Sequence, residues 1–153
     1  MGCKSRVSVS VALDGPSVLA GREEMFKVLV CGDRNWTDSE LIRTRLAKLV
    51  QSAEVGTQAL LLIHGAARGA DSIAGTIARA WAETMPINIS EFPANWGLYG
   101  RAAGPIRNRE MLQMRPDLVL AFHDDIESSR GTKNMVAIAR KTGVPVEVIK
   151  HEH

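Results

Sequence analysis

The chain has 153 residues and a formal net charge of +2, and 45% of its residues are hydrophobic. This length suits one domain with an ordinary buried core, and so small a net charge argues against nucleic acid as a partner. Two cysteines build no disulfide framework, and no apolar run approaches the ~20 residues of a membrane-spanning helix. We therefore expect a single cytoplasmic domain with no membrane partner.

Residues 1–24 differ in pattern from the rest of the chain. The stretch VSVSVAL has the composition of a short strand, but Asp14 interrupts it before a signal-peptide core is reached. Met25 stands directly before the first convincing strand and is a second candidate for the translation start. We expect a poorly ordered N-terminal tail over residues 1–24 and one folded domain over residues 25–153.

Apolar runs alternate with helical patterns from residue 26 onward. Five runs have the length and composition of strands, namely residues 26–31, 59–64, 87–92, 117–122 and 144–149. Three segments between them place apolar side chains at helical spacing, namely residues 37–50, 71–84 and 132–142. A fourth helix, over residues 105–115, is predicted from the proline at its first position and from Pro116 after its end. Strands that alternate with helices form parallel sheets through right-handed crossovers. We predict an α/β fold, a single Rossmann-like three-layer domain with a parallel sheet of about five strands and helices on both faces.

Each of the first four strands is followed by a loop rich in glycine or charge. In a parallel sheet such loops gather at one edge, where helix N-termini also point, so we predict one pocket there for a phosphate-bearing small molecule. The candidate ligand-binding residues in or beside these loops are Gly32, Arg34, Trp36, Gly65, Ala66, Arg68, Gly69, Asp71, Asn95, Trp96, Arg107, Asn108, Gly131 and Thr132.

The chemistry of these loops suits an anion. Glycines let backbone N–H groups approach a phosphate closely, and a following helix N-terminus adds partial positive charge. The spacing of Gly65 and Gly69 matches neither the dinucleotide-binding motif G-x-G-x-x-G nor the triphosphate-binding motif G-x-x-x-x-G-K-[ST]. Arg107 falls near the start of a helix, where a cation opposes the helix dipole, and an anion nearby would explain its position.

Several of these residues also have a purely structural interpretation. Thr37, Asp71 and Thr132 stand where helices are expected to begin, so each is predicted to cap its helix. Asp71 is equally suited to accept hydrogen bonds from a ribose or a base. The two loop tryptophans, Trp36 and Trp96, are suited either to stack on a nucleobase or to plug the rim of the core.

A metal site is not predicted. His64, His123 and Asp124 lie near strand ends, but neither an H-x-x-x-H spacing nor a Cys/His cluster accompanies them. Cys31 ends an apolar run, so we predict that it is a small buried hydrophobic residue in a reducing compartment. We expect the protein to need no metal and no cofactor.

Five segments together resemble the YspA-like proteins of the SLOG superfamily, which are Rossmann-like domains named for the Smf/DNA-processing and Lonely-guy families. The segments are VLVCGDRNW, LLIHGAARGADSIA, FPANWGLYGRAAGPIRNREML, DLVLAF and GTKNM, all between residues 26 and 149. The resemblance implies a nucleotide or nucleotide-derived ligand bound at the carboxyl ends of the strands. It also implies a homodimer formed by helix packing.

The more distant Lonely-guy relatives are phosphoribohydrolases that release a base from a nucleoside monophosphate. Their Arg-Lys motif before a Met is matched in part by Arg107, Asn108 and Met111, and their Gly-Thr motif by Gly131 and Thr132. Where those enzymes keep a catalytic glutamate, this chain has Asn134, which cannot supply a carboxylate.

The sequence leaves three functions to be compared. The leading hypothesis is binding, for sensing or processing, of a nucleotide-derived small molecule. An N-glycosidic hydrolase or transferase is the second, and it would need a carboxylate such as Asp33, Asp71 or Asp124 near the reacting carbon. Single-stranded DNA binding, by analogy with the Smf proteins, is the third, and the near-neutral charge disfavours it.

Overall fold

A computed structural model describes residues 25–151, and the predicted tail at residues 1–24 lies outside this range. Five parallel strands form one sheet in the order β3-β2-β1-β4-β5. Their bounds are β1 (Phe26–Gly32), β2 (Leu60–His64), β3 (Ile87–Glu91), β4 (Leu118–Phe122) and β5 (Val146–Ile149). This arrangement confirms the predicted Rossmann-like α/β fold.

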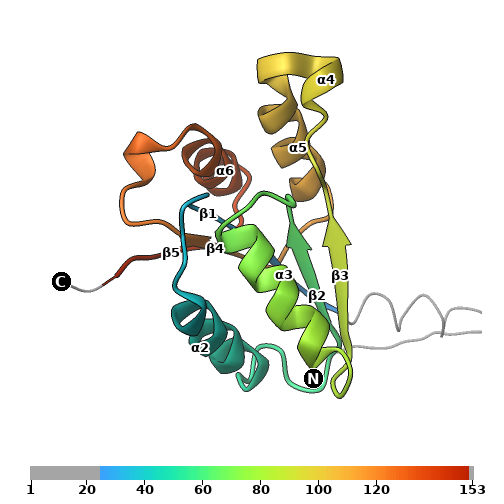
Figure 1. Cartoon of the computed structure of the whole chain (residues 1–153). Coiled ribbons are helices and arrows are strands. Elements are labelled where there is room, and N and C mark those ends of the chain that lie inside the picture. Colours follow the sequence, from blue (N-terminus) through green and yellow to red (C-terminus); the bar gives the residue numbers. More distant parts are fainter. Residues whose placement is uncertain (1–24, 152–153) are drawn as a thin grey trace, which may run out of the picture.

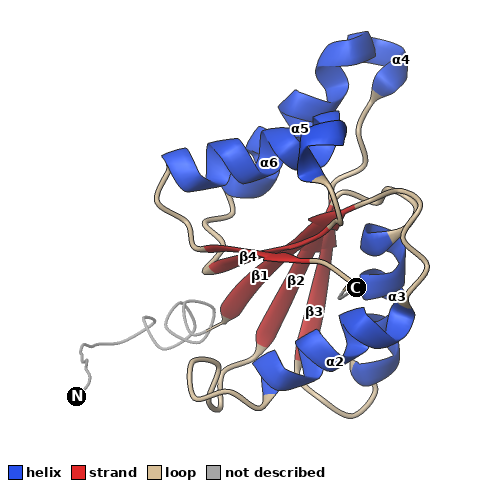
Figure 2. Ribbon diagram, turned by 90° about the vertical axis from the view of Figure 1, so that its left-hand side faces the viewer, coloured by secondary structure: helices blue, strands red, loops and turns tan. Residues whose placement is uncertain are grey.

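Four helices cover the two faces of the sheet, so the domain has three layers (Figure 2). On one face lie α2 (Ser39–Val50) and α3 (Ala70–Trp81), and on the other lie α5 (Ala103–Leu112) and α6 (Arg130–Lys141). Three short elements sit in the connections, namely α4 (Trp96–Tyr99) and the 3₁₀ turns η1 (Gly100–Ala102) and η2 (Ile126–Ser128). In Figure 1, α4 and α5 extend beyond the carboxyl ends of β2 and β3.

The central strand β1 is buried on both of its faces. Val28 and Val30 join the apolar cluster on the side of α2 and α3. Leu29 and Cys31 join the cluster on the side of α5 and α6, which includes Met135. Because alternate residues of a strand point to opposite faces, a strand covered on both sides needs the continuous apolar run found here.

The strand order changes direction between β1 and β4, which are hydrogen-bonded neighbours. Open α/β sheets bind ligands in the crevice outside the carboxyl ends of two such strands. Gly32 ends β1 directly opposite Phe122 at the end of β4. A Cβ added to Gly32 would lie 2.8 Å from the Cβ of Ala70, so only glycine lets β1 end this close to α3.

The structure corrects three predicted helix caps. Asp38, not Thr37, caps α2, and its carboxylate accepts a hydrogen bond of 3.1 Å from the N–H of Leu41. Ser129, not Thr132, caps α6, and its hydroxyl accepts from the N–H of Thr132 at 3.1 Å. The third helix, α3, begins after Gly69 without a side-chain cap, and Asp71 lies inside it.

Candidate functional site

A pocket of about 630 Å³ opens at the edge of the sheet where β1 and β4 end. The loop after β1, the start of α5 and the start of α6 form its walls, together with His123, which directly follows β4. Many predicted site residues come together here, namely Gly32, Arg34, Asp71, Trp96, Arg107, Asn108, Gly131 and Thr132. Segments from both halves of the chain therefore contribute to one cavity.

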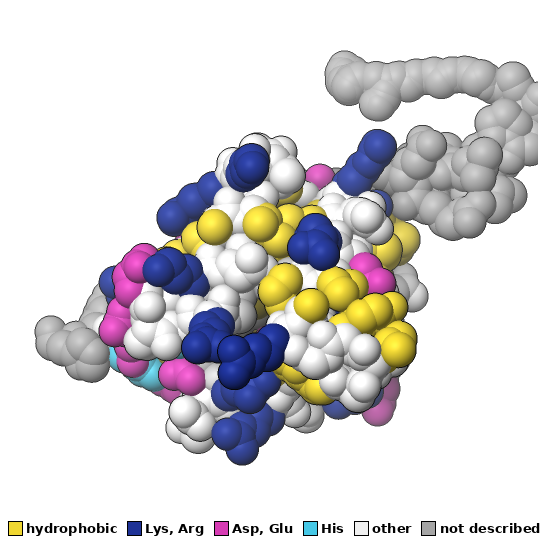
Figure 3. All heavy atoms as spheres, turned by 90° about the horizontal axis from the view of Figure 1, so that it is seen from above, with side chains coloured by type: hydrophobic (Ala, Val, Ile, Leu, Met, Phe, Trp, Pro, Cys, Tyr) yellow, Lys and Arg dark blue, Asp and Glu magenta, His cyan; other side chains and the backbone are white. Residues whose placement is uncertain are grey.

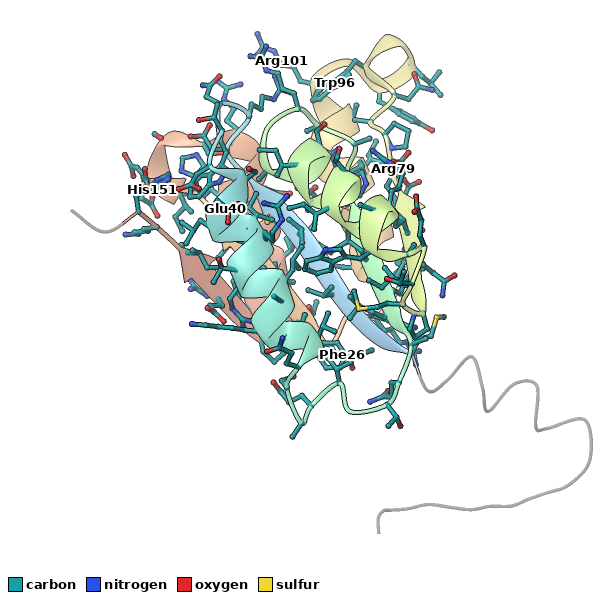
Figure 4. The ribbon with its side chains drawn as sticks, turned by 60° about the horizontal axis from the view of Figure 1, so that its bottom comes forward. Phe26, Glu40, Arg79, Trp96, Arg101 and His151 are labelled. Atoms are coloured by element: carbon teal, nitrogen blue, oxygen red, sulfur yellow. The ribbon has the colours of Figure 1, made fainter. Side chains whose placement is uncertain are left out.

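A second pocket of about 400 Å³ lies beside the first and shares part of its wall. It contains three further predicted residues, Gly65, Ala66 and Arg68, in the loop after β2. Figure 3 shows the molecule from this end, where Lys and Arg side chains gather in the middle of the face beside a hydrophobic area. In Figure 4, Trp96 and Arg101 lie at the same end of the molecule, far from Phe26 at the start of β1.

Arg107 is held by hydrogen bonds from two of its guanidinium nitrogens. Nη1 donates to the carbonyl of Gly65 at 2.6 Å, and Nε donates to Oδ1 of Asn108 at 3.1 Å. Burial lowers the pKa of Arg107 from its ordinary value, and the negative charge of Asp71 acts in the opposite direction. The bonds fix the guanidinium group at the border of the two pockets, and no protein acceptor within residues 25–151 bonds to Nη2.

The next residue along α5, Asn108, joins this helix to the start of α6. Its buried amide nitrogen Nδ2 donates to the carbonyl of Gly131 at 3.2 Å and to Oδ1 of Asn134 at 2.9 Å. The amide oxygen accepts from Arg107, so the side chain is hydrogen-bonded at both ends. Asn108 and Asn134 therefore join α5 to α6 in the wall of the larger pocket.

The carboxylate of Asp71 binds N–H groups of the loop after β2, which the sequence analysis predicted to bind a phosphate. Its side chain is inside α3 and buried, and Oδ2 accepts from the N–H groups of Gly65 at 2.8 Å and Ala67 at 3.5 Å. The N–H of Ala66 donates to Nδ1 of His64 at 3.0 Å. The N–H groups of Gly65, Ala66 and Ala67 thus donate to acceptors within the protein, and phosphate binding by this loop stays a prediction.

Burial raises the pKa of Asp71 to about 6, even though hydrogen bonds from Gly65 and the charge of Arg107 act to lower it. A carboxyl group buried in apolar surroundings loses hydration of its charged form, which explains the direction. Asp71 lines the larger pocket, so a carboxyl group that titrates near neutral pH borders the cavity.

Gly69 has a structural role and lines neither pocket. Its φ is +82°, in the left-handed region, and a Cβ added there would overlap the carbonyl oxygen of Asp33. The N–H of Ala70 donates to that same carbonyl at 3.2 Å. The start of α3 is therefore packed against the loop after β1.

The start of α6 is open to the larger pocket. Ser129, Arg130, Gly131 and Thr132 all line this cavity, and a Cβ on Gly131 would have no described heavy atom within 4 Å beyond the adjacent residues and the local backbone of α6. The first N–H groups of a helix have no acceptor within it. Ser129 accepts from Thr132, which leaves the N–H groups of Arg130 and Gly131 without an acceptor in the described part of the chain.

The two loop tryptophans have different environments. Trp36 is only 4% exposed, stacks on the ring of His151 with centroids 4.3 Å apart, and donates from Nε1 to the carbonyl of Asp38 at 2.9 Å. This packing matches the alternative in which Trp36 covers the rim of the core, and contact of Trp36 with a base stays a prediction. Trp96 is 49% exposed and lines both pockets, with the guanidinium carbon of Arg34 6.0 Å from its ring centroid.

Asn95 lies outside both pockets and has a local role. Its side chain caps α4 by accepting from the N–H of Leu98 at 3.0 Å. The sequence did not predict the short helix α4 within the loop that follows β3, and ligand contact by Asn95 stays a prediction.

Sequence reasoning omitted several residues that line the larger pocket, among them Arg101, Arg130 and Ser129. The clustering of arginines beside the four loops was the available signal for Arg101 and Arg130. The sequence did not predict Ser129, because the expected cap of α6 was Thr132, three residues later. Within residues 25–151, no group of three or more His, Cys, Asp or Glu side chains is arranged to hold a metal ion. None of the described helices combines the length and apolar character required to cross a membrane.

Comparison with known proteins gives two matches to this chain. A family model, YAcAr, described as the YspA, cpYpsA-related SLOG family, matches residues 26–99. Gene 61 protein of Mycobacterium phage D29 is 35% identical over 125 residues, which are 80% of this chain and 94% of the phage protein. No solved structure gives a significant match.

Proposed function

Because the chain belongs to the YspA, cpYpsA-related SLOG family, we propose that it binds a nucleotide or a nucleotide-derived ligand in the larger pocket. SLOG membership suggests nucleotide-related binding or processing. The position of the pocket supports this proposal, since it opens where the strand order changes direction between β1 and β4.

The observation that carries the proposal is the gathering of positively charged groups around this cavity. Its walls hold four arginines together with the open start of α6, namely Arg34, Arg101, Arg107 and Arg130. Guanidinium groups bind phosphate oxygens in pairs, and a helix start favours negative charge. Asp33 and Asp71 are the carboxylates on the same wall, so positive charge exceeds negative charge there.

The geometry supports a division of roles within the bound ligand. Arg107 and the free N–H groups at Arg130 and Gly131 would bind a phosphate. Trp96 offers an exposed aromatic face for the base, and base stacking on aromatic side chains needs no particular base. Asn108 would act by holding Arg107 and the start of α6 in place, since its own polar groups are occupied.

Calorimetric titration of the full chain tests the proposal. AMP, GMP, CMP and UMP are the ligands, and the four matching nucleosides are the controls. We expect at least one nucleotide to bind about tenfold or more tightly than its nucleoside, because the phosphate supplies the charge-assisted bonds. Equal affinity for nucleotide and nucleoside, or no binding of any nucleotide, would contradict the proposal.

Arg107→Ala should abolish this preference for the phosphate. The matched control is Arg140→Ala, an exposed arginine of α6 that lines neither pocket. If Arg107→Ala binds the nucleotide with unchanged affinity, Arg107 does not bind the phosphate.

One observation favours a second candidate function, hydrolysis or transfer at the N-glycosidic bond of a nucleoside monophosphate. Asp71 borders the cavity with a pKa of about 6, and a carboxyl group with such a pKa can exchange a proton near neutral pH. Incubation with the four nucleoside monophosphates, followed by chromatography for free base, tests it. Base released by the unaltered protein and not by Asp71→Asn would support catalysis, and its absence would leave binding alone.

A further inference from the structure

Two pockets lie side by side at this end of the molecule, and they share one wall. Two loops and two helices contribute to that wall, through Arg34, Ala67, Trp96 and Arg107. The larger pocket continues toward α6, whereas the smaller one continues over the loop after β2 and past Pro93 and Ala94. A ligand in the larger pocket therefore meets the entrance of the smaller one at Arg107.

The smaller pocket is strongly positive. Arg34, Arg68 and Arg107 line it, and neither Asp nor Glu is among its described lining residues. The N–H groups of Gly65, Ala66 and Ala67 turn inward to Asp71 and His64, so the guanidinium groups supply the positive charge of this pocket. Three arginines without a facing carboxylate are expected to attract an anion.

Arg107 is oriented for contact with both cavities. Its Nη1 and Nε are bonded to Gly65 and Asn108, so the guanidinium plane is fixed, and Nη2 makes no bond within residues 25–151. Arg34 lies over the Trp96 ring at the same border. Cations at such a border can bind one anionic group on each side.

We propose that the ligand carries a second phosphoryl group, which binds in the smaller pocket to Arg68 together with Arg34 and Arg107. This inference rests on the proposed function, since the nucleotide itself lies in the larger pocket. The chemical class is a nucleotide with two phosphoryl groups, either adjacent as in a nucleoside 5′-diphosphate or separate as in a nucleoside 3′,5′-bisphosphate.

Two arginines allow the pockets to be tested independently. Arg68 lines the smaller pocket alone and Arg130 the larger one alone, and both are exposed. The full chain is titrated with the 5′-monophosphate, 5′-diphosphate and 3′,5′-bisphosphate of each of the four bases. At least one two-phosphate probe should bind about tenfold or more tightly than the matching monophosphate. Which of the two gains affinity tells whether the phosphoryl groups are adjacent or separate.

The variants separate this inference from the proposed function. Arg68→Gln should remove the preference for the two-phosphate probe and leave monophosphate affinity unchanged, whereas Arg130→Gln should weaken both. Arg140→Gln is the control and should change neither. Tighter binding that survives Arg68→Gln, or two-phosphate probes that bind no better than monophosphates, overturns the second site and leaves the proposed function standing. A chain that binds none of the probes overturns both.

Discussion

Gly65 leaves the space that the guanidinium group of Arg107 fills. A Cβ added to Gly65 would overlap Nη1 of Arg107 and lie 2.8 Å from its Cζ. The same Nη1 donates to the Gly65 carbonyl at 2.6 Å, across 42 positions of the sequence. The glycine thus positions an arginine from another helix.

Gly65→Ala should weaken nucleotide binding about tenfold or more while the protein stays folded. The added methyl group displaces the tip of a flexible side chain and no backbone, so the guanidinium moves out of place at little cost to the fold. Calorimetry and a thermal melt measure the two effects. Gly97→Ala is the matched control, because the nearest atom to its Cβ is 3.8 Å away and Gly97 lines neither pocket. Full affinity in Gly65→Ala would show that Arg107 tolerates displacement.

Gly69→Ala should lower the free energy of unfolding by about 1–3 kcal/mol or more. The φ of +82° disfavours a side chain, and the Cβ would lie 2.6 Å from the backbone carbon of Arg34. Urea denaturation measures the change. Gly131→Ala has open space around its Cβ and should leave stability unchanged or slightly raised. Equal stability of the two variants would contradict this account of the junction between β1 and α3.

Asn108 and Asn134 should be energetically coupled. Their side chains share a hydrogen bond of 2.9 Å between α5 and α6, and Asn108 is buried. Asn108→Ala should lower the free energy of unfolding by about 1–3 kcal/mol, because it leaves the Gly131 carbonyl and the Asn134 amide without their donor. A double-mutant cycle with Asn134→Ala, measured in urea, should give a coupling of about 1 kcal/mol. Strictly additive effects would show that this bond contributes nothing to the helix pair.

Asp71 should make stability fall as pH rises. Its pKa is raised from 3.8 to about 6, so the folded protein holds the proton more tightly than the unfolded chain does. Its stabilising contribution is therefore complete below pH 3.8 and is lost as the pH rises through about 6. The difference between the two pKa values corresponds to about 3 kcal/mol.

Asp71→Asn should therefore gain stability relative to the unaltered chain between pH 4 and pH 8, by up to about 3 kcal/mol. Urea denaturation at several pH values measures this difference. Asp125→Asn replaces an exposed carboxylate outside both pockets and serves as the control. A difference between Asp71→Asn and the unaltered chain that does not change with pH would refute the effect of burial.

Local pattern was sufficient to predict the fold. The run from Phe26 to Cys31 is apolar enough to be buried on both faces, and the alternation of strands and helices allows few topologies other than a parallel sheet. The same logic brought the loops after the strands to one edge of the sheet, so Arg107 and Gly131 line one cavity. These features depend on hydrophobic periodicity and on the direction of the strands, and both can be deduced from the amino-acid sequence alone.

The identity of the groups facing the ligand depended on contacts between distant segments. Trp36 and Trp96 look alike in sequence, but Trp36 is covered by His151 from the far end of the chain and Trp96 is not. Gly65 donates its N–H to Asp71, because the cap of α3 is Gly69, two residues before the expected cap, and Asp71 therefore lies inside the helix. The packed helices decide which neighbours surround a polar group, and those neighbours decide whether the group faces a ligand or another part of the protein. Only the tertiary structure specifies these neighbours.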